Sequence, residues 1–320
     1  MSLQEHSPHP TFRLLVGWAI FAFAIGLSAA EPEYSRDISG WQEIPVPPEG
    51  ENPDRAVWYF AANYSDISWR VYLENTRPKA RLIHSANDDL PDPAPFDAKA
   101  DNFSGASHFK KIDDGWLVGF NHGEFGSALY WFNDDGKQHY KISNHQVVAF
   151  FSLSDGVYAI EGLAHMGASC GSVIRITRSA NVARWQASRV VRLPYAPNTV
   201  AVRRDGSILI VLSDSFVSVD QDHHVTTLIS DAAWGGLYPS SSILLPNESR
   251  LYVGMRQFVG EVDLATNHLR LLVPSANFLN KLPERDERRI RAQNSRGAQN
   301  FRLSAEICEE LEKAADRNGR

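Results

Sequence analysis

Between about Trp41 and Val273 the chain repeats one pattern, in which short alternating or β-branched runs are separated by turn residues. The segment NTVAVRR, DG, SILIVLS, FVSVD, QDHH, VTTLIS contains the whole pattern and predicts a four-stranded antiparallel meander. Its first-hairpin turn falls near residue 206, and equivalent turns fall near 115, 156 and 248, which gives spacings of 41, 50 and 42 residues. Periods of roughly 40 to 50 residues are typical of propeller blades. The sequence therefore predicts an all-β fold, a single β-propeller of four-stranded blades.

The number of blades follows from how many copies of the pattern are complete. Four copies begin at SHFKKI, VVAFFSL, NTVAVRR and SSILLP, and a degenerate first copy is expected from WYFAAN, WRVYLEN and ARLIH between residues 41 and 84. Five blades are therefore preferred. Six are possible if residues 85–103 contain strands, although their density of Pro and Asp favours a loop. A two-sheet sandwich or two small barrels is the structural alternative.

The N-terminus predicts export. An uncharged apolar run, Leu14 to Leu27, follows Arg13 and precedes a small-residue pattern that ends at Ala30. With its Ala pair the segment has roughly 17 residues, short of the roughly 20 that span a bilayer. We interpret 1–30 as a cleaved signal peptide and expect a periplasmic or secreted protein. An uncleaved membrane anchor is the alternative.

The C-terminal region differs from the repeats. Residues 31–283 are assigned to the propeller, and 284–320 to a charged, partly disordered tail with a short helix after Ser304. The chain has only two cysteines, Cys170 and Cys308, and the second lies in this tail. Disulfides are therefore not expected to hold the fold together, although an exported protein could form one.

Charge and motifs exclude several classes of function. A formal charge of −6 and a pI near 6.0 provide no basic field, so nucleic acid is not an expected partner. No Gly-rich phosphate loop, Cys cluster or EF-hand spacing occurs, so no nucleotide or Fe–S cofactor is implied. Gly167 to Gly171 matches G-x-S-x-G, but a strand-forming run follows it where a nucleophile elbow needs a helix. Ser169 is therefore not interpreted as a nucleophile.

Several longer motifs carry a family resemblance. The stretches GFNHGEFGSALYWF, EGLAHMGASCGSVIRI, LPYAPNTV, LYPSSSILL and YVGMRQFVGEVDL resemble those of a group of exported bacterial propeller-like proteins of unassigned function. The resemblance covers about residues 113–274. It implies a fold and an exported location, and it supplies no activity and no catalytic residues.

The predicted topology places the loops of all blades at two ends. Antiparallel strands alternate in direction, so the loop after each second strand opens at one end and the Asp-Gly turns open at the other. We call these ends the loop face and the turn face. The turn face carries residues that turn geometry alone explains, including Asp222, His223 and His224. Titratable and amide side chains are predicted on the loop face, among them Asn63, Tyr64, Asp66, His122, Glu124, Glu161, His165, Asn198, Ser213, Asp214, Tyr238, Ser240 and Arg256.

Three chemistries fit such a face. A divalent metal could be bound by His122, Glu124 and His165, since imidazole and carboxylate suit Zn, Mn or Fe. Without a metal, His122 or His165 could act as a general base, with Glu124 in the same site and Arg256 stabilising an anionic intermediate. The third possibility is binding alone. Each of these residues also has a purely structural interpretation, as a solvated loop residue or a brace between blades. His108 and His145 are interpreted as packing residues of the inner strands.

The leading hypothesis is an exported, monomeric binding or sensing module. Its loop face would recognise a small polar ligand, a saccharide or a protein through Glu161, Asn198, Asp214, Tyr238 and Ser240. A lyase or hydrolase with a His/Glu/Arg site on the same face, with or without a divalent metal, is the alternative. No cofactor other than such a metal is expected, and the membrane is involved only if the N-terminal segment is retained.

Overall fold

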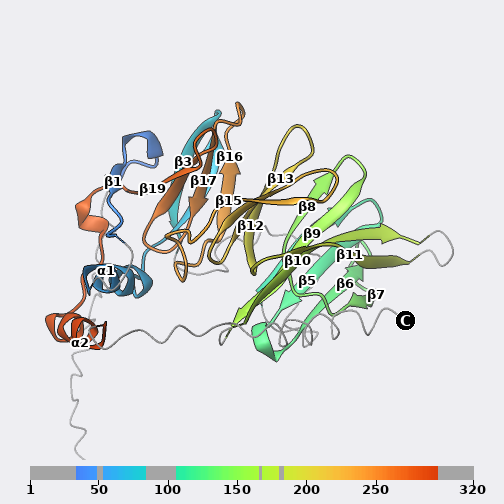
Figure 1. The fold of residues 1–320 in the computed structure, drawn as a ribbon. Helices are drawn as coiled ribbons and strands as arrows, with labels where there is room; N and C mark the ends of the chain where they lie inside the picture. The colour runs from blue at the N-terminus through green and yellow to red at the C-terminus, as the bar shows by residue number, and fades with distance from the viewer. Residues whose placement is uncertain (1–33, 49–52, 84–105, 166–167, 180–183, 295–320) are drawn as a thin grey trace, which may run out of the picture. The chain divides into compact units, whose positions relative to one another are not determined.

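The computed structural model describes residues 34–48, 53–83, 106–165, 168–179 and 184–294. These residues form a β-propeller of four-stranded blades, each an antiparallel meander in sequence order (Figure 1). In the described residues four blades are complete, and a two-stranded hairpin is found where the degenerate first blade was predicted. Predicted features that lie outside the described residues are the signal segment 1–30, the loop 85–103 and the helix after Ser304.

The strand bounds agree closely with the predicted runs. The first complete blade comprises β4 (Ala106–Ile112), β5 (Gly115–Asn121), β6 (Ser127–Phe132) and β7 (His139–Ser143). The second comprises β8 (Val147–Leu153), β9 (Gly156–His165), β10 (Ala168–Arg178) and β11 (Trp185–Leu193). The third comprises β12 (Pro197–Val202), β13 (Ile208–Leu212), β14 (Phe216–Val219) and β15 (Val225–Ile229). The fourth comprises β16 (Ser241–Leu244), β17 (Arg250–Gly254), β18 (Val259–Asp263) and β19 (His268–Val273).

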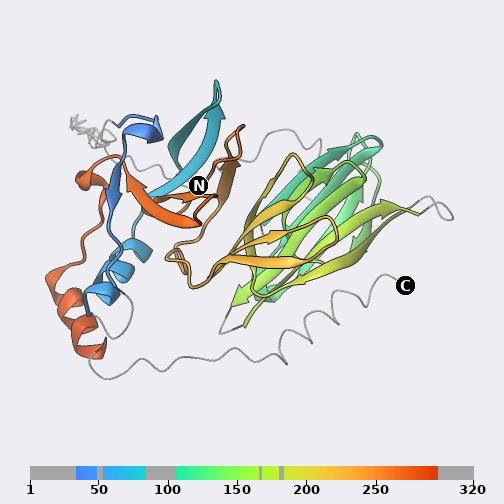
Figure 2. The ribbon, with the colours of Figure 1, turned by 45° about the horizontal axis from the view of Figure 1, so that its top comes forward.

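Successive blades bury apolar side chains against each other. Leu117 of β5 and Ile174 of β10 belong to one buried cluster, and Ile160 of β9 and Ile210 of β13 belong to the next. The sheets β8–β11 and β12–β15, which share the cluster that contains Ile160 and Ile210, lie side by side (Figure 2). Each of these four side chains is fully buried. Stacked repeats of this kind share a core between neighbours, which explains why the fold tolerates so many short strands.

The hairpin of β2 (Ser68–Glu74) and β3 (Arg77–Ile83) packs on the fourth blade. The Trp69 amide donates to the Met255 carbonyl at 3.0 Å, and its indole Nε1 donates to the Gln257 carbonyl at 3.1 Å. A Cβ on Gly254 would lie 2.4 Å from the Trp69 carbonyl oxygen, so only glycine permits this approach. Two of the three strands predicted between residues 41 and 84 are thus confirmed.

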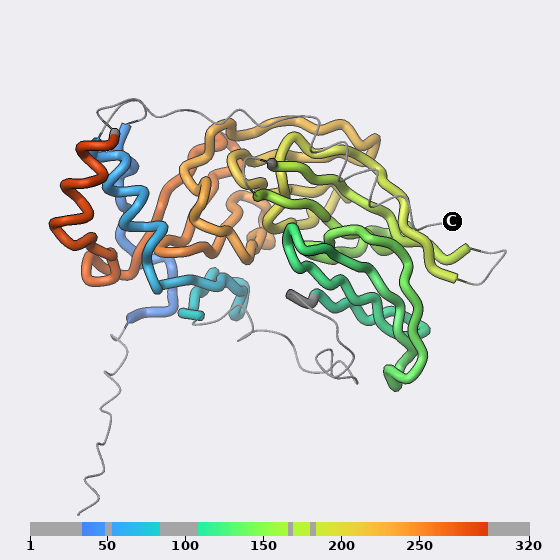
Figure 3. Tube along the Cα trace, turned by 90° about the horizontal axis from the view of Figure 1, so that it is seen from below, coloured from blue at the N-terminus to red at the C-terminus, as the bar shows by residue number. Residues whose placement is uncertain are grey.

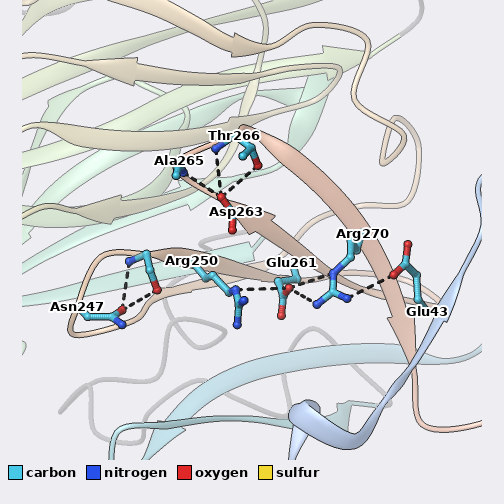
Figure 4. A network of polar contacts seen from close by, with 9 residues as sticks. Glu43, Asn247, Arg250, Glu261, Asp263, Ala265, Thr266 and Arg270 are labelled. Atoms are coloured by element: carbon cyan, nitrogen blue, oxygen red, sulfur yellow. Dashed lines mark hydrogen bonds and ion pairs between the residues drawn. The ribbon is translucent and has the colours of Figure 1, made fainter.

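An additional strand, β1 (Gln42–Ile44), extends the fourth blade to five strands by pairing with β19. Side chains across the sheet support this pairing (Figure 4). Arg270 on β19 contacts Glu43 at 3.3 Å and also bonds Glu261 on β18, which is 5% exposed. Burial, together with Glu261, raises the pKa of the neighbouring Tyr252 to about 12. Arg270 thus pairs with the buried Glu261 carboxylate on β18 and with Glu43 on β1, and so it links β1 to the blade.

The run WYFAAN is helical, which corrects the prediction of a strand there. It belongs to α1 (Pro53–Asn63), which starts with Pro at its first position and Asp54 in its first turn, both favourable at a helix N-terminus. Trp58 stacks on Phe258 at 5.6 Å, and Ala62 is buried. The helix forms because residues 58 and 62, four apart, share one apolar face that the fourth blade covers.

A second helix, α2 (Glu284–Asn294), occupies the start of the predicted tail. Three acidic residues lie in its first turn and Arg291 lies in its last, as the helix dipole favours. Arg291 contacts Asp54 of α1 at 2.7 Å, and the two helices lie side by side (Figure 3). The helix predicted after Ser304 lies outside the described residues, whereas residues 284–294, which were predicted to belong to a charged tether, form α2. Three 3₁₀ turns, η1 (Ile38–Gly40), η2 (Gly123–Phe125) and η3 (Ala276–Phe278), complete the described elements.

Cys170 of β10 takes part in a disulfide, contrary to the expectation from the sequence. The only other cysteine of the chain, Cys308, lies outside the described residues. In the part of the chain that the structure describes, no helix has the length and apolar character needed to cross a membrane.

Candidate functional site

On the loop face, loops of the first three complete blades contact the neighbouring blade. Glu124 in η2 contacts His165 at the end of β9, and the Ser169 hydroxyl of β10 lies 2.8 Å from that of Ser213, which follows β13. On the turn face, the Asp205 turn and the turn before β9 line a common cleft. The loops and the Asp-Gly turns therefore lie at opposite ends of the strands, as predicted.

Tyr238 and Arg256 lie together on this face. Tyr238 precedes β16, has φ of +53° and is 60% exposed. A bulky side chain in the left-handed region costs roughly 1 kcal/mol or more, and such strain is concentrated at functional sites. The Arg256 guanidinium carbon lies 4.5 Å from the centroid of the Tyr238 ring. Arg256 Nη1 also donates to the carbonyl oxygen of Asn63 and lies 3.3 Å from its Oδ1, so helix α1 fixes the guanidinium.

Helix α1 adds Tyr59, a residue that the sequence analysis did not single out. Asn63 Nδ2 donates to the Tyr59 hydroxyl at 3.3 Å, and burial raises the pKa of this phenol. A Cβ on Gly236 would lie 1.8 Å from the Tyr59 oxygen, so the loop before Tyr238 passes directly over it. Among the described residues the Tyr59 proton has no acceptor. The hydroxyl is thus a neutral donor available to a ligand.

Asp214 supplies an acceptor beside these donors. Its side chain is exposed, and Oδ2 accepts a hydrogen bond from the Ser213 hydroxyl at 3.0 Å. A Cβ on Gly235 would lie 2.8 Å from Asp214 Oδ1, which places the carboxylate against the same loop. The Ser213 hydroxyl is also hydrogen-bonded to the Ser169 hydroxyl, and the Ser169 oxygen accepts a hydrogen bond from the Ala196 amide at 2.9 Å. Ser169 therefore lies on a strand and bridges two blades, as expected for a residue that is not a nucleophile.

His165 and Glu124 form a separate pair on this face. The Glu124 carboxylate contacts His165 Nε2, and both side chains are partly exposed, at 42% for His165 and 38% for Glu124. His122 instead packs its ring against Phe125 at 5.4 Å. The printed contacts of Arg256 are with Asn63 and Tyr238. The candidate catalytic residues thus fall into two groups, one on η2 and β9 and one on the fourth blade and α1.

The remaining predicted ligand residues have different environments. Glu161 is 7% exposed inside β9, which pairs with β10 as a hairpin, and it accepts a hydrogen bond from the Ser172 hydroxyl, so it is a buried strand residue and not part of an open loop. Asn198 lies within β12 and is partly buried. Ser240 is exposed, and its amide donates to the Gly254 carbonyl at 2.9 Å.

The histidines assigned to packing agree with that role. His145 is 1% exposed and its Nδ1 lies 2.7 Å from the Ser143 hydroxyl. Burial lowers the pKa of His108 on β4 to about 4. Within the described ranges, no group of three or more His, Cys, Asp or Glu side chains is placed to hold a metal ion. In this geometry Glu124 and His165 are two of the three proposed ligands, and His122 does not complete the set.

Comparisons with known proteins assign no family. No family model matches the chain, and no curated protein matches it. Among solved structures it is similar to virginiamycin B lyase from Staphylococcus aureus, with a TM-score of 0.38 and 15% identity over 55% of this chain and 58% of the lyase. The chain spans little more than half the length of the virginiamycin B and streptogramin B lyases it matches.

Two further solved structures have similar scores. One is a protein of unknown function from Bacteroides caccae, with a TM-score of 0.36 and 12% identity over 67% of this chain and 74% of that one. The other is a protein from Lactobacillus plantarum, with a TM-score of 0.36 and 10% identity over 69% and 68% of the two chains. Similarity at this level transfers no activity to the chain.

Proposed function

We propose that the chain is a binding or sensing module that recognises a saccharide on the loop face, at the site formed by Tyr59, Asn63, Asp214, Tyr238 and Arg256. The exposed Tyr238 ring, held in the left-handed backbone region beside Arg256, is the observation that carries the proposal. An aromatic face packs well on the apolar face of a sugar ring, and planar polar side chains around it pair with hydroxyls.

The donors and acceptors around the ring complement those of a sugar. Arg256 is fixed by Asn63, so little side-chain entropy is lost when it binds. The Tyr59 hydroxyl offers a donor, and Asp214 offers an acceptor that can take hydroxyl protons. A second exposed aromatic residue, Tyr64, is 67% exposed and stacks on Phe60 at the end of α1. Clustered Tyr and Arg side chains are typical of binding hot spots.

A variant that keeps the backbone and removes the ring tests this site. Asn tolerates the left-handed region, so Tyr238→Asn removes the aromatic face without adding strain. We expect it to weaken saccharide binding by about tenfold or more, as for a hot-spot residue. Binding is measured by thermal shift and calorimetry with peptidoglycan fragments and with neutral and uronate oligosaccharides. Leu73→Asn, at an exposed position on the β2–β3 hairpin, is the matched control and should bind as the wild type. Equal binding by both variants, or no binding by the wild type, refutes the proposal.

The Glu124–His165 pair supports a second candidate function, lyase or hydrolase chemistry. A carboxylate that orients an imidazole leaves the other ring nitrogen available as a general base. If the ligand is also a substrate, Glu124→Gln and His165→Ala should abolish its turnover and leave Tyr238-dependent binding intact. Turnover that persists in both variants rules this function out.

For the location we propose export to the periplasm or the exterior. The apolar segment 14–27 supports this, and so does the Cys170 disulfide, because disulfides persist mainly in oxidising compartments. Detection of a mature chain that begins near Glu31 would support the proposal, and a cytosolic full-length chain would refute it.

A further inference from the structure

A cleft of about 700 Å³ lies on the turn face, between the blades β8–β11 and β12–β15. It opens beside the turn before Gly156 and the Asp205-Gly206 turn, at the end of the strands opposite to the saccharide site. The sequence analysis explained these turn residues by turn geometry alone. The volume is that of a pocket for a small organic ligand, since such pockets measure roughly 300 to 1,000 Å³.

The acidic side chains of the cleft are already engaged. Asp155 accepts a hydrogen bond from the Tyr158 hydroxyl at 2.8 Å and pairs with Arg175 at 3.0 Å. Asp205 accepts from the amide and the hydroxyl of Ser207, at 2.9 and 2.6 Å, within its own turn. Asp220 is bonded likewise to His224 at the end of the next turn, at 2.8 and 3.2 Å. These carboxylates therefore offer little to neutralise a further cation.

The basic side chains are not all engaged. Arg204 pairs with Glu248 and donates to the Pro246 carbonyl of the next blade. Arg203 is different, because its Nε is shielded from solvent and makes no hydrogen bond, although its charge attracts the exposed Asp205 carboxylate in the same turn. Arg175 Nε is also shielded and unbonded. A shielded donor without a partner costs free energy until an acceptor arrives, so these two groups favour an anion in the cleft.

One wall of the cleft is aromatic. Phe151 and Tyr158 stack at 5.6 Å with an interplanar angle of 21°, and the Arg175 guanidinium carbon lies 5.7 Å from the Tyr158 centroid. Val173, Val191 and Ile208 extend the apolar lining. A ligand that fills this space has a flat or cyclic apolar body as well as an anionic group. The planar guanidinium matches a carboxylate, which it can bind through two parallel hydrogen bonds.

We propose that the cleft is a second binding site, one that takes a small cyclic or aromatic carboxylate with Arg203 as its anchor and Phe151 and Tyr158 as its wall. The site is independent of the saccharide site because it lies at the other end of the blades and shares no residue with it. A ligand bound in the cleft would contact both blades, which share a hydrophobic core.

Benzoate and cyclohexanecarboxylate are suitable probes, with benzamide as the uncharged counterpart of benzoate. Binding is measured by calorimetry and by amide shift changes in the full chain. We expect both carboxylates to bind, with shifts at Tyr158 and Gly206, and benzamide to bind at least about tenfold more weakly because it lacks the charge. Arg203→Gln should weaken benzoate binding by a similar factor, whereas Arg288→Gln, at an exposed position on α2, should not.

The folding of the variant is informative in itself. Because the shielded Arg203 Nε makes no hydrogen bond and the attraction between Arg203 and the exposed Asp205 is weak, Arg203→Gln should melt close to the temperature of the wild type, whereas loss of a structural arginine would lower it clearly. Tyr238→Asn should bind benzoate normally, which separates failure here from failure at the saccharide site. The proposal is overturned if neither carboxylate binds, if benzamide or inorganic phosphate binds as tightly, or if Arg203→Gln leaves binding unchanged.

Discussion

His108 on β4 makes the stability of the propeller sensitive to mild acid. It lies on the strand that pairs with β5 in the first complete blade, and burial of its partly exposed side chain lowers its pKa from 6.5 to about 4. The lowered pKa means that the folded state resists a proton that the unfolded state accepts.

The magnitude follows from linkage. Above pH 6.5 the imidazole is neutral in both states, so its titration does not change the free energy of unfolding. As the pH falls from 6.5 to about 4, the unfolded chain binds a proton and the folded chain does not, so stability falls. One pKa unit corresponds to about 1.36 kcal/mol, which makes the full loss about 3 kcal/mol over this window. Below pH 4 both states are protonated and the loss stops.

The assay is urea unfolding of the wild type and His108→Gln at intervals between pH 8 and pH 4. Glutamine does not titrate, so the difference in unfolding free energy between the two proteins should change by about 3 kcal/mol in favour of the variant as the pH falls. His268→Gln, an exposed histidine on β19, controls for the substitution itself. A difference between wild type and His108→Gln that stays constant across the window refutes the reasoning.

Three further predictions follow from packing, pairing and covalent structure. Gly119→Ala should destabilise the protein by about 1–3 kcal/mol in thermal or urea unfolding, because its Cβ would lie 2.5 Å from Val147 Cβ of the next blade; a neutral effect would show that the blades are not so closely packed. Arg270→Ala should cost about 1–2 kcal/mol and remove hydrogen-exchange protection from β1, since Glu261 stays buried without its main partner; unchanged protection of β1 would contradict this. Thiol titration of the denatured, unreduced protein should find no free Cys170, and a reactive thiol there would exclude the disulfide.

The strands could be predicted because each depends on local signals. The run NTVAVRR, for example, alternates apolar and polar residues and ends at Asp205-Gly206, and the structure has β12 and its turn there. Helix α1 could not be predicted from its composition, since VWYF also favours a strand. The stronger signal was Pro53 followed by Asp54, a helix start that the aromatic run obscured.

The candidate sites were harder to predict because they depend on contacts between blades. The approach of Arg256 to Asn63 joins residues 193 positions apart, and no local pattern encodes it. Tyr59 was missed with its helix. The cleft at Arg203 was missed because it forms where two hairpin turns of neighbouring blades lie together, while each turn by itself is fully explained by its Asp and Gly residues.

Hydrogen exchange of the full chain with and without the tightest-binding oligosaccharide is the most direct test of the saccharide site. The predicted result is added protection in residues 59–66, 235–240 and 254–258, with the turns at 154–156 and 203–206 unchanged. Protection confined to those turns, or no protection with any oligosaccharide, would contradict the assignment of ligand recognition to the loop face.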